Sequence, residues 1–497
     1  MSRRALLYAA GAGVAAGAAL SMSSTAQAQD APVASDQLVT YPIPDGVTQN
    51  TSFTVRVRTP GGHWQPVSAY LVTLEVIDTT TGHGQVQNSS MAYFDFVGGV
   101  EVSVTYNTAA VESAQIRPLS YGIAPHIQHG DTVTFILDRP RNLVIQVNDD
   151  IFDCLHLLAG AIDTSPPDST DPDVLYYGPG LHTVAGNVLT VPSGKTVYLA
   201  GGAVLRAGVT FSNVDSVKLL GRGVIIAPSG GACTAEYSTD VEIGGVTMLD
   251  PNGYAVTAGQ VDGLTITGVR AFSSKGNGDG IDLFCCTNAV IDGVFMRNSD
   301  DCIALYNHRW DYYGDSGDIT VKNSTLWADV AHPINVGTHG NTDSPETMDG
   351  LTFTNIDILD HREPQMLYQG CIALNPGDSN LIRNVYAEDI RVEDFRWGQL
   401  INMRVMYNDK YNTSPGRGID TVHIKNLSYN GTHANPSILV GYDEDRPISN
   451  VTFENLVING MAVHDTMQKP TWYLTSDFVP MYANEHVHNL TFLPAQS

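Results

Sequence analysis

Three aspartates lie close together in the middle of the sequence, and their spacing suits acid–base chemistry. Asp279 stands in the run G-D-G-I-D, and Asp300 and Asp301 follow in the run N-S-D-D. Hydrolysis of a glycosidic bond uses such a set, because one carboxylic acid protonates the leaving oxygen and a second carboxylate acts on water or on the sugar. Like charges this close also raise the pKa of one member, which keeps it protonated near neutral pH. The three side chains are therefore the predicted catalytic residues of an O-glycosyl hydrolase.

The segment that carries these aspartates is repetitive. A short apolar–polar–apolar strand pattern recurs nine times, and a Gly, Asn or Asp stands four residues after each leading residue. These residue types tolerate the left-handed backbone of a tight corner. The leading residues are Val217, Val241, Leu264, Ala289, Ile319, Leu351, Val385, Val422 and Val451, at spacings of 24, 23, 25, 30, 32, 34, 37 and 29 residues. Repeats of this length predict a solenoid, and we expect an all-β fold, a right-handed parallel β-helix.

The repeat positions predict where the aspartates lie in space. Asp279 follows its leading residue by 15 positions, and Asp300 and Asp301 follow theirs by 11 and 12. Neighbouring coils of stacked strands lie about 4.8 Å apart. We therefore expect the three side chains on one face, with carboxyl groups roughly 6.5–9.5 Å apart, as in an inverting glycosidase. Similar offsets place further residues on that face, and these are predicted to bind substrate: His332, Arg362, Glu363, Arg396 and Trp397.

The lengthening of the repeats after Ala289 indicates loops that grow on one face and build a cleft. Aromatic faces stack on sugars, and polar neighbours bond to hydroxyl groups. Further predicted substrate-binding residues are His308, Arg309 and Trp310 after the Asp pair, His339 between glycines, and Tyr368 and Arg404. Asp282 is expected to support a turn or to bond to the catalytic carboxylates.

Upstream of the repeats the pattern changes twice. Residues 29–162 contain runs that alternate apolar and polar residues between turns, which predicts an N-terminal antiparallel β-sandwich. Residues 163–173 are polar and Pro-rich and form the expected linker, so the β-helix domain is expected at 174–497. Residues 1–28 read as a signal peptide that resembles a twin-arginine signal, with a small-residue cleavage site at 26–28. The protein is therefore expected to be secreted, extracellular or periplasmic.

The composition excludes several classes of function. The formal charge of −26 argues against nucleic acid, whose phosphates require Lys and Arg. After the leader there is no run of roughly 18 apolar residues, so no membrane span is expected. The six cysteines form no C-x-x-C pair, and we expect buried packing residues, no metal site and no cofactor. One or two disulfides stay open, a monomer is expected, and the expected partner is a polysaccharide substrate.

Several motifs resemble a known clan of enzymes. Asn277-Gly278-Asp279, Asp300-Asp301 and the run that begins at His332-Pro333 resemble the active-site motifs of polygalacturonase-type glycoside hydrolases of family 28. They also resemble those of the dextranase/isopullulanase-type family 49, whose pattern adds an N-terminal β-sandwich. The resemblance covers most of the chain after the leader and implies an inverting enzyme. It also implies that Asp300 is the general acid and that Asp279 and Asp301 share the role of base.

One departure from family 28 bears on the substrate. The Arg-Ile-Lys element that grips a uronate carboxylate has no clear match, and the nearest candidate, Arg404-Val405-Met406, lacks the Lys. With the sandwich, this slightly favours a dextran-like α-glucan, with polygalacturonan or another pectic glycan a close second. Two alternatives remain: a polysaccharide lyase whose Asp cluster holds calcium, and a non-catalytic glycan-binding solenoid. Linkage, endo or exo action and the role of the N-terminal domain are left open.

Overall fold

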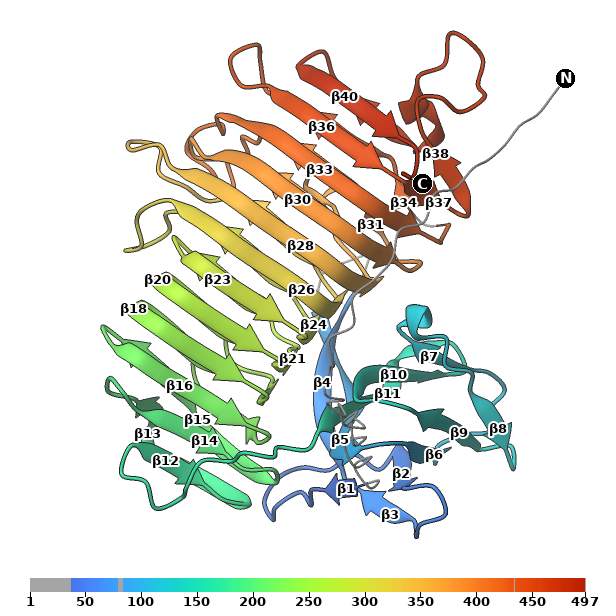
Figure 1. Ribbon diagram of the computed structural model, residues 1–497, viewed down its shortest axis with the longest axis vertical. Helices are drawn as coiled ribbons and strands as arrows, with labels where there is room; N and C mark the ends of the chain where they lie inside the picture. The colour runs from blue at the N-terminus through green and yellow to red at the C-terminus, as the bar shows by residue number, and fades with distance from the viewer. Residues whose placement is uncertain (1–36, 79–83, 433, 497) are drawn as a thin grey trace, which may run out of the picture. The chain divides into compact units, whose positions relative to one another are not determined.

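The computed structural model describes residues 37–78, 84–432 and 434–496 (Figure 1). The predicted signal peptide lies outside the described residues. Within those ranges the elements are β-strands, apart from the short 3-10 helices η1 (Leu119–Tyr121), η2 (Met366–Tyr368) and η3 (Thr475–Phe478). The all-β prediction is therefore confirmed. No helix of the described part is long and apolar enough to cross a membrane.

Before the repeats, the described chain forms two β-sheets. One has the order β1-β5-β11-β10-β7, with β4 paired to β5, and the other has the order β3-β2-β6-β9-β8. The first sheet consists of β1 (Gln37–Thr40), β4 (Ala69–Ile77), β5 (Gly84–Val97), β7 (Ala114–Arg117), β10 (Arg141–Val147) and β11 (Asp150–Ala161). The second consists of β2 (Phe53–Arg58), β3 (Gln65–Val67), β6 (Val100–Tyr106), β8 (His126–Gln128) and β9 (Thr132–Leu137).

The two sheets share one apolar core, as expected of a sandwich. Strand β2 shows why: Phe53, Val55 and Val57 are buried, whereas the residues between them are exposed. One pairing departs from the predicted antiparallel arrangement, because β5 and β11 run parallel. Strands of the second sheet lie between them in the sequence, and this long connection lets the chain return in the same direction.

From Val174 onward the strands stack in three columns, each built from parallel pairs. The first column runs through β12 (Val174–Tyr177), β14 (Thr196–Leu199), β16 (Asp215–Gly221), β18 (Cys233–Gly244), β20 (Val256–Thr267), β23 (Thr287–Asp292), β26 (Ser316–Ala328), β28 (Thr347–Asp360), β30 (Leu381–Val392), β33 (Gly418–Tyr429), β36 (Ile448–Glu454) and β40 (Val487–Leu493). Figure 1 shows this column as successive arrows from green to red.

The second and third columns continue each coil. The second contains β13 (Gly180–Thr190), β15 (Ala203–Ser212), β17 (Val224–Ile225), β19 (Thr247–Leu249), β21 (Arg270–Phe272), β24 (Phe295–Asn298), the ends of β26, β28, β30 and β33, and β37 (Leu456–Ile458). The third contains the ends of β13 and β15, the starts of β18 and β20, then β22 (Ile281–Phe284), β25 (Ile303–Tyr306), β27 (Ile334–Gly337), β29 (Ile372–Asn375), β32 (Ile401–Arg404), β35 (Ser437–Val440) and β39 (Met481–Ala483). Outside the columns lie β31 (Gly398–Gln399), β34 (Ala434–Asn435) and β38 (Met461–Val463).

The register of the first column confirms the predicted repeat. The nine leading residues pair directly, from Val217 with Val241 to Val422 with Val451. All nine corner residues have positive φ, from 53° to 124°. Later corners are Asn or Asp, and their side chains bond from coil to coil, as Asn355 Nδ2 does to Asn323 Oδ1 at 2.8 Å. The right-handed winding stays a prediction.

The inside of the stack is filled by Val, Ile, Leu and other apolar side chains in one continuous core. All six cysteines are buried and free, which confirms the expectation of packing residues. Burial raises the pKa of thiols such as Cys302, so they stay protonated and unreactive. The core therefore forms a rigid support for the turns that join the second column to the third.

Candidate active site

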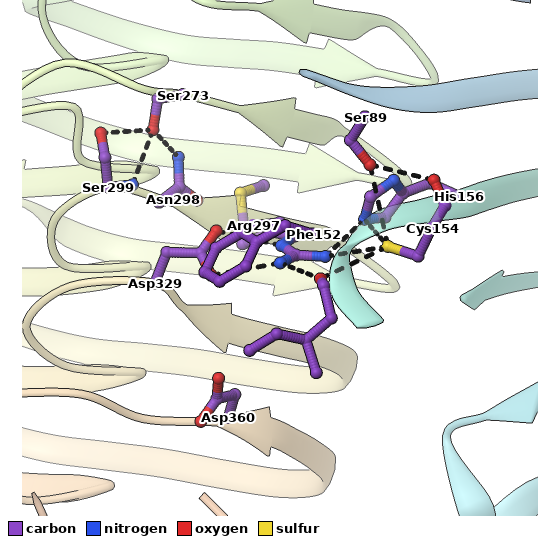
Figure 2. Close-up of polar contacts among 12 residues, drawn as sticks. Ser89, Phe152, Cys154, His156, Ser273, Arg297, Asn298, Ser299, Asp329 and Asp360 are labelled. Atoms are coloured by element: carbon purple, nitrogen blue, oxygen red, sulfur yellow. Dashed lines mark hydrogen bonds and ion pairs between the residues drawn. The ribbon is translucent and has the colours of Figure 1, made fainter. Parts of the chain in front are cut away.

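The predicted catalytic aspartates lie in two neighbouring turns between the second and third columns. Asp279 lies between β21 and β22, and Asp300 and Asp301 lie between β24 and β25. The hydroxyl of Ser273 accepts a 3.0 Å hydrogen bond from the Ser299 backbone N–H and donates to the Gly278 carbonyl. Figure 2 shows Ser273 as the shared partner of Ser299 and Asn298. One buried serine therefore holds the two turns together.

The three carboxylates form one close group. One oxygen from each of Asp279, Asp300 and Asp301 lies within 4.8 Å of the others. This distance joins single oxygens, whereas the predicted distance of roughly 6.5–9.5 Å separates whole carboxyl groups. The spacing alone therefore does not decide between inversion and retention.

Asp301 is held in place by four hydrogen bonds. Its Oδ1 accepts from His332 N at 3.0 Å and from His332 Nδ1 at 2.6 Å. Its Oδ2 accepts from Tyr306 Oη at 3.0 Å and from Asn335 Nδ2 at 2.7 Å. Burial alone would raise the pKa of Asp301, but the His332 charge and these bonds hold it below the usual value. Asp301 is therefore ionised.

His332 carries the positive charge of this group. Its Nδ1 faces Asp301, and its Nε2 lies 2.5 Å from the Tyr368 carbonyl oxygen. Both neighbours are acceptors, so both ring nitrogens donate, and the ring is an imidazolium. Although burial lowers the pKa of His332, Asp301 raises it to about 9. The predicted substrate-binding residue His332 is fully buried behind Asp301 and acts on the carboxylate instead of lining the cavity.

Asp300 has the opposite protonation behaviour. Burial and the adjacent Asp301 charge raise the pKa of Asp300 to about 7. Burial and the charges of Asp282, Asp300 and Asp301 also raise the pKa of Asp279 well above its usual range. The site therefore contains one carboxylate fixed as an anion beside one acid that is about half protonated at neutral pH.

Asp282 lies on β22 beneath Asp279. It is completely buried, and neither of its carboxyl oxygens has a hydrogen-bond partner among the described residues. Burial and the charges of Asp301 and Asp300 raise the pKa of Asp282 well above its usual range. The raised pKa keeps Asp282 a neutral acid beside Asp279, and the supporting role expected for Asp282 stays a prediction.

The three carboxylates are also the one cluster of the described residues whose spacing would suit a metal ion. Calcium takes six to eight oxygen ligands. The oxygens of Asp301 already accept four hydrogen bonds, and His332 places a positive charge directly behind them. This arrangement fits acid–base chemistry better than cation binding.

A cavity of about 910 Å³ opens in front of the triad. Nine of the predicted site residues line it: Asp279, Asp300, Asp301, Arg309, His339, Arg362, Glu363, Tyr368 and Trp397. They come from several successive coils, so the cavity extends along the stack. His339 contacts the ring of Tyr306, and burial lowers its pKa to about 3, so it is a neutral ring in the wall.

Four other predicted substrate-binding residues lie outside the cavity lining. His308 Nδ1 bonds to the Tyr312 carbonyl oxygen at 2.6 Å, and its ring stacks on Tyr313. Trp310 is 55% exposed and lies beside Phe284 and under the Arg309 guanidinium. The others are Arg396, which pairs with Asp329 and Asp360, and Arg404, which donates to the Leu367 carbonyl. These four side chains take part in loop packing, hydrogen bonds and ion pairs, and they do not line the cavity.

The cavity also contains residues that the sequence did not single out as substrate contacts. They are Ile77, Asp78, Tyr254, Asn277, Tyr306, Val330, Ala331, Pro364, Gln365, Lys410 and Tyr411. Asn277 and Tyr306 flank the Asp motifs in the sequence, and this proximity could have predicted that they line the cavity. Ile77, at the end of β4, comes from the N-terminal sheets, and nothing in its sequence context indicates a cleft. The N-terminal domain therefore contributes to the cavity wall.

Three cations face the cavity although the chain as a whole is acidic. They are Arg309, Arg362 and Lys410. Arg362 is 7% exposed, and its Nη1 has no hydrogen-bond partner among the described residues. Lys410 Nζ donates to Tyr411 Oη at 2.7 Å and interacts electrostatically with Glu363 and Asp300. A buried guanidinium nitrogen without a partner is uncommon in folded proteins.

A stack of parallel coils with a carboxylate triad at one edge defines the class of this protein as a β-helix-like scaffold with a glycosidase-type site. The profile "Glycosyl hydrolases family 28" matches residues 229–475. The predicted resemblance to the clan of glycoside hydrolases that contains families 28 and 49 is therefore confirmed. The matched segment includes every predicted catalytic and substrate-binding residue.

Two curated relatives are similar over part of their length. Probable endopolygalacturonase D of Neosartorya fischeri is 24% identical over 323 residues, which are 62% of this chain and 60% of that protein. Endopolygalacturonase B of Aspergillus niger is 29% identical over 185 residues, or 36% of this chain and 44% of that protein. The chain thus spans about half of the length of these relatives.

Two solved structures share the fold at low sequence identity. Dex49A from Penicillium minioluteum has a TM-score of 0.64 at 13% identity and covers 91% of this chain and 96% of its own. The family 28 exopolygalacturonase of Yersinia enterocolitica has a TM-score of 0.51 at 13% identity and covers 80% and 97%. Both matches extend into the N-terminal sheets, since each covers more of the chain than residues 174–497.

Proposed function

We propose that this protein is an exported, metal-independent glycoside hydrolase that cleaves the O-glycosidic bonds of a polysaccharide with inversion. Asp300 transfers its proton to the glycosidic oxygen as the bond between that oxygen and the anomeric carbon breaks. A water molecule attacks the anomeric carbon, and Asp301 takes the water proton. Asp279 bonds to the same water and orients it, because its raised pKa leaves Asp301 as the carboxylate that takes the proton. The products are two shorter glycans, and the site is restored when Asp301 releases its proton to solvent and Asp300 takes one up.

The observation that carries this proposal is the difference in pKa between adjacent carboxyl groups. Asp300 has a pKa of about 7, while the pKa of Asp301 is held below its usual value by His332. Two neighbouring acids with pKa values pushed apart are the pattern of an acid and a base that work together. A purely structural Asp-Asp turn needs no such difference, which weighs against the glycan-binding alternative.

For the substrate we favour an acidic glycan of the polygalacturonate type ahead of dextran. The sequence slightly favoured dextran because of the N-terminal sandwich and because no Lys follows the Arg of the family element. In the cavity, Arg362 and Lys410 supply cations from other coils. The unpartnered Nη1 of Arg362 suits a uronate carboxylate, because guanidinium and carboxylate groups match in geometry. The relatives named as endopolygalacturonases support the same choice.

The test is release of reducing ends from polygalacturonate, dextran, pullulan and arabinan by the wild type and by Asp300→Asn. We expect release from polygalacturonate that the substitution abolishes and that a chelator leaves unchanged. Release from dextran alone would replace the substrate but keep the mechanism. A chelator-sensitive product that absorbs in the ultraviolet would identify a lyase instead, and activity that survives Asp300→Asn would refute the assigned acid.

A further inference from the structure

A chain of four buried or half-buried charges runs behind the cavity. Arg297 Nε donates to Asp329 Oδ2 at 3.0 Å, and Arg396 Nη2 donates to Asp329 Oδ1 at 3.1 Å. Arg396 Nε then donates to Asp360 Oδ2 at 2.5 Å. Arg297, Asp329 and Asp360 are at most 3% exposed. We call these four residues the charge chain, and Figure 2 shows its Arg297–Asp329 part.

Each member of the charge chain leads directly into a residue of the active site. The offsets are short in every coil, one to three residues, since each member lies near the end of the second column, where the cavity turn begins. Arg297 precedes Asp300 by three residues, Asp329 precedes His332 by three, Asp360 precedes Arg362 by two, and Arg396 precedes Trp397 by one. The charge chain is therefore a second layer that fixes the start of four cavity turns.

The N-terminal sandwich anchors this layer at Arg297. The guanidinium uses its remaining donors on β11: Nη2 donates to the Ile151 carbonyl at 2.6 Å, and Nη1 donates to Cys154 Sγ at 3.3 Å and to His156 Nε2 at 3.0 Å. Figure 2 shows Cys154 and His156 reaching Arg297 from the β11 strand. Arg297 is completely buried, so these contacts satisfy donors that water does not reach.

The chemistry of His156 fits the role of acceptor. Its Nδ1 lies 3.0 Å from the Ser90 carbonyl and carries the proton, which leaves Nε2 as an acceptor for Arg297. Burial and the Arg297 charge lower the pKa of His156 well below its usual value, so the ring stays neutral. The Arg297 guanidinium also lies 3.8 Å from the Trp327 ring centroid and 5.6 Å from that of Phe152. The site is built to hold one arginine rotamer.

We propose that the N-terminal sandwich positions the catalytic turn, with His156 and Arg297 as positioning residues that set the location of Asp300 and Asp301. This inference rests on the proposed hydrolase activity and gives the sandwich a role in turnover beyond its contact with the stack. Loss of the His156 acceptor leaves a buried guanidinium donor unpaired, and Arg297 then shifts to find another acceptor. A displacement of about 1 Å at reacting groups can cost roughly 100-fold in rate.

The experiment compares His156→Leu, His156→Gln and Arg297→Lys with wild type at a temperature where all are folded. The matched control is Arg222→Met. Arg222 also joins the sandwich to the stack, since its Nε donates to Asp95 Oδ2 at 2.8 Å, but it lies at an early corner of the stack away from the cavity. The readouts are kcat and KM on the active polymer, and hydrogen exchange of the peptide that spans residues 299–306.

We expect His156→Leu to lower kcat by about 10- to 100-fold with KM changed less than 3-fold, and to speed exchange in that peptide. His156→Gln keeps an acceptor oxygen and should recover most of the rate. Arg222→Met should lower the melting temperature but keep kcat and the exchange pattern.

Wild-type kcat in both His156→Leu and Arg297→Lys would overturn the proposal, and so would an equal loss of kcat in Arg222→Met. If His156→Leu does not fold, the comparison of Arg297→Lys with Arg222→Met decides alone. If the wild type hydrolyses no polymer, the proposed function fails. The exchange of residues 299–306 still tests the positioning role in that case: faster exchange in the His156 and Arg297 variants alone supports it, and unchanged exchange overturns it.

Discussion

His332 and Asp301 form the ion pair of the site, with 2.6 Å between Nδ1 and Oδ1. The Tyr368 carbonyl holds the opposite ring nitrogen, so the imidazolium is fixed between two acceptors. This contact makes Asp301 a carboxylate at neutral pH while its neighbour Asp300 keeps a proton. The difference in protonation between Asp300 and Asp301 depends on one buried histidine that does not line the cavity.

Replacement of His332 should raise the pKa of Asp301. In His332→Gln the positive charge is lost, and burial and the neighbouring carboxylates then act on Asp301 unopposed. We expect kcat to fall by roughly 100-fold and the acidic limb of the pH–rate profile to move to higher pH. Full pH profiles of wild type and variant check this. An unchanged acidic limb would contradict the assigned role of Asp301 as base.

The same histidine predicts a pH dependence of stability. Its pKa is about 9 in the folded chain against 6.5 for the ordinary group. A raised pKa stabilises the protonated fold, so the contribution is fully present below pH 6.5 and disappears as the pH rises through about 9. Urea unfolding of the wild type should show a loss of stability between these values. His332→Gln, the matched control, should lack this part of the pH dependence.

Asp300→Asn should lower kcat by roughly 100- to 10,000-fold, because an amide cannot protonate the leaving oxygen. In the wild type, activity should fall above about pH 7, where Asp300 loses its proton. Residual activity of the variant should lack this alkaline limb. Glu454→Gln, a buried carboxyl substitution on β36 away from the cavity, serves as the matched control and should keep both rate and profile.

The strand repeat was predictable because its rules are local. A left-handed corner needs Gly, Asn or Asp whatever lies around it, so the corners from Gly221 to Asn455 are visible in the sequence. The strands after each corner bury apolar side chains in one core, and the same apolar pattern recurs in every coil. The parallel return of β5 next to β11 was not predictable, since it depends on which sheet each strand joins.

The cavity was only partly predictable, and Arg362 and Arg396 show why. Each lies 11 residues after its leading residue, and both were expected to face the substrate. The isolated bridge between Arg362 and Trp397 shows that the two turns differ in register by one residue. A slip of one residue sends a side chain to the opposite face. Arg362 therefore lines the cavity, whereas Arg396 turns back to Asp329 and Asp360.

Lys410 and Tyr411 show a second limit. They come from a loop of the longest repeat, and only the folded loop brings them to the cavity. No spacing rule relates them to the triad, because loop shape is set by contacts such as the 2.5 Å bond from Asn412 Nδ2 to the Thr338 carbonyl. The missing Lys of the family element therefore gave an incomplete view of the charges in the site.

Ionisation of the buried Asp282 should destabilise the fold as the pH rises. Its pKa is raised by burial in the folded chain, so folding is favoured while the group is protonated and disfavoured once it ionises. Asp282→Asn removes this titration and keeps the size of the side chain and one oxygen that accepts hydrogen bonds. We expect its melting temperature to exceed that of the wild type by an amount that grows from about pH 4 upward, with activity within roughly 3-fold. A variant less stable than the wild type at pH 8 would contradict this assignment.

Arg362 provides the sharpest test of the substrate. Arg362 lines the cavity, and its buried Nη1 has no hydrogen-bond partner among the described residues, so Arg362→Met removes a charge that forms no ion pair within them. A charge-assisted hydrogen bond contributes about 1.5–3 kcal/mol, so KM for polygalacturonate should rise roughly 10- to 100-fold. The melting temperature should hold or rise, because a buried unpaired donor is lost.

The matched control is Arg391→Met, whose guanidinium pairs with Asp357 outside the cavity. It should lose stability and keep KM. If Arg362→Met raised KM equally for a neutral glycan, the carboxylate would not be its partner, and the proposal of an acidic substrate would fail.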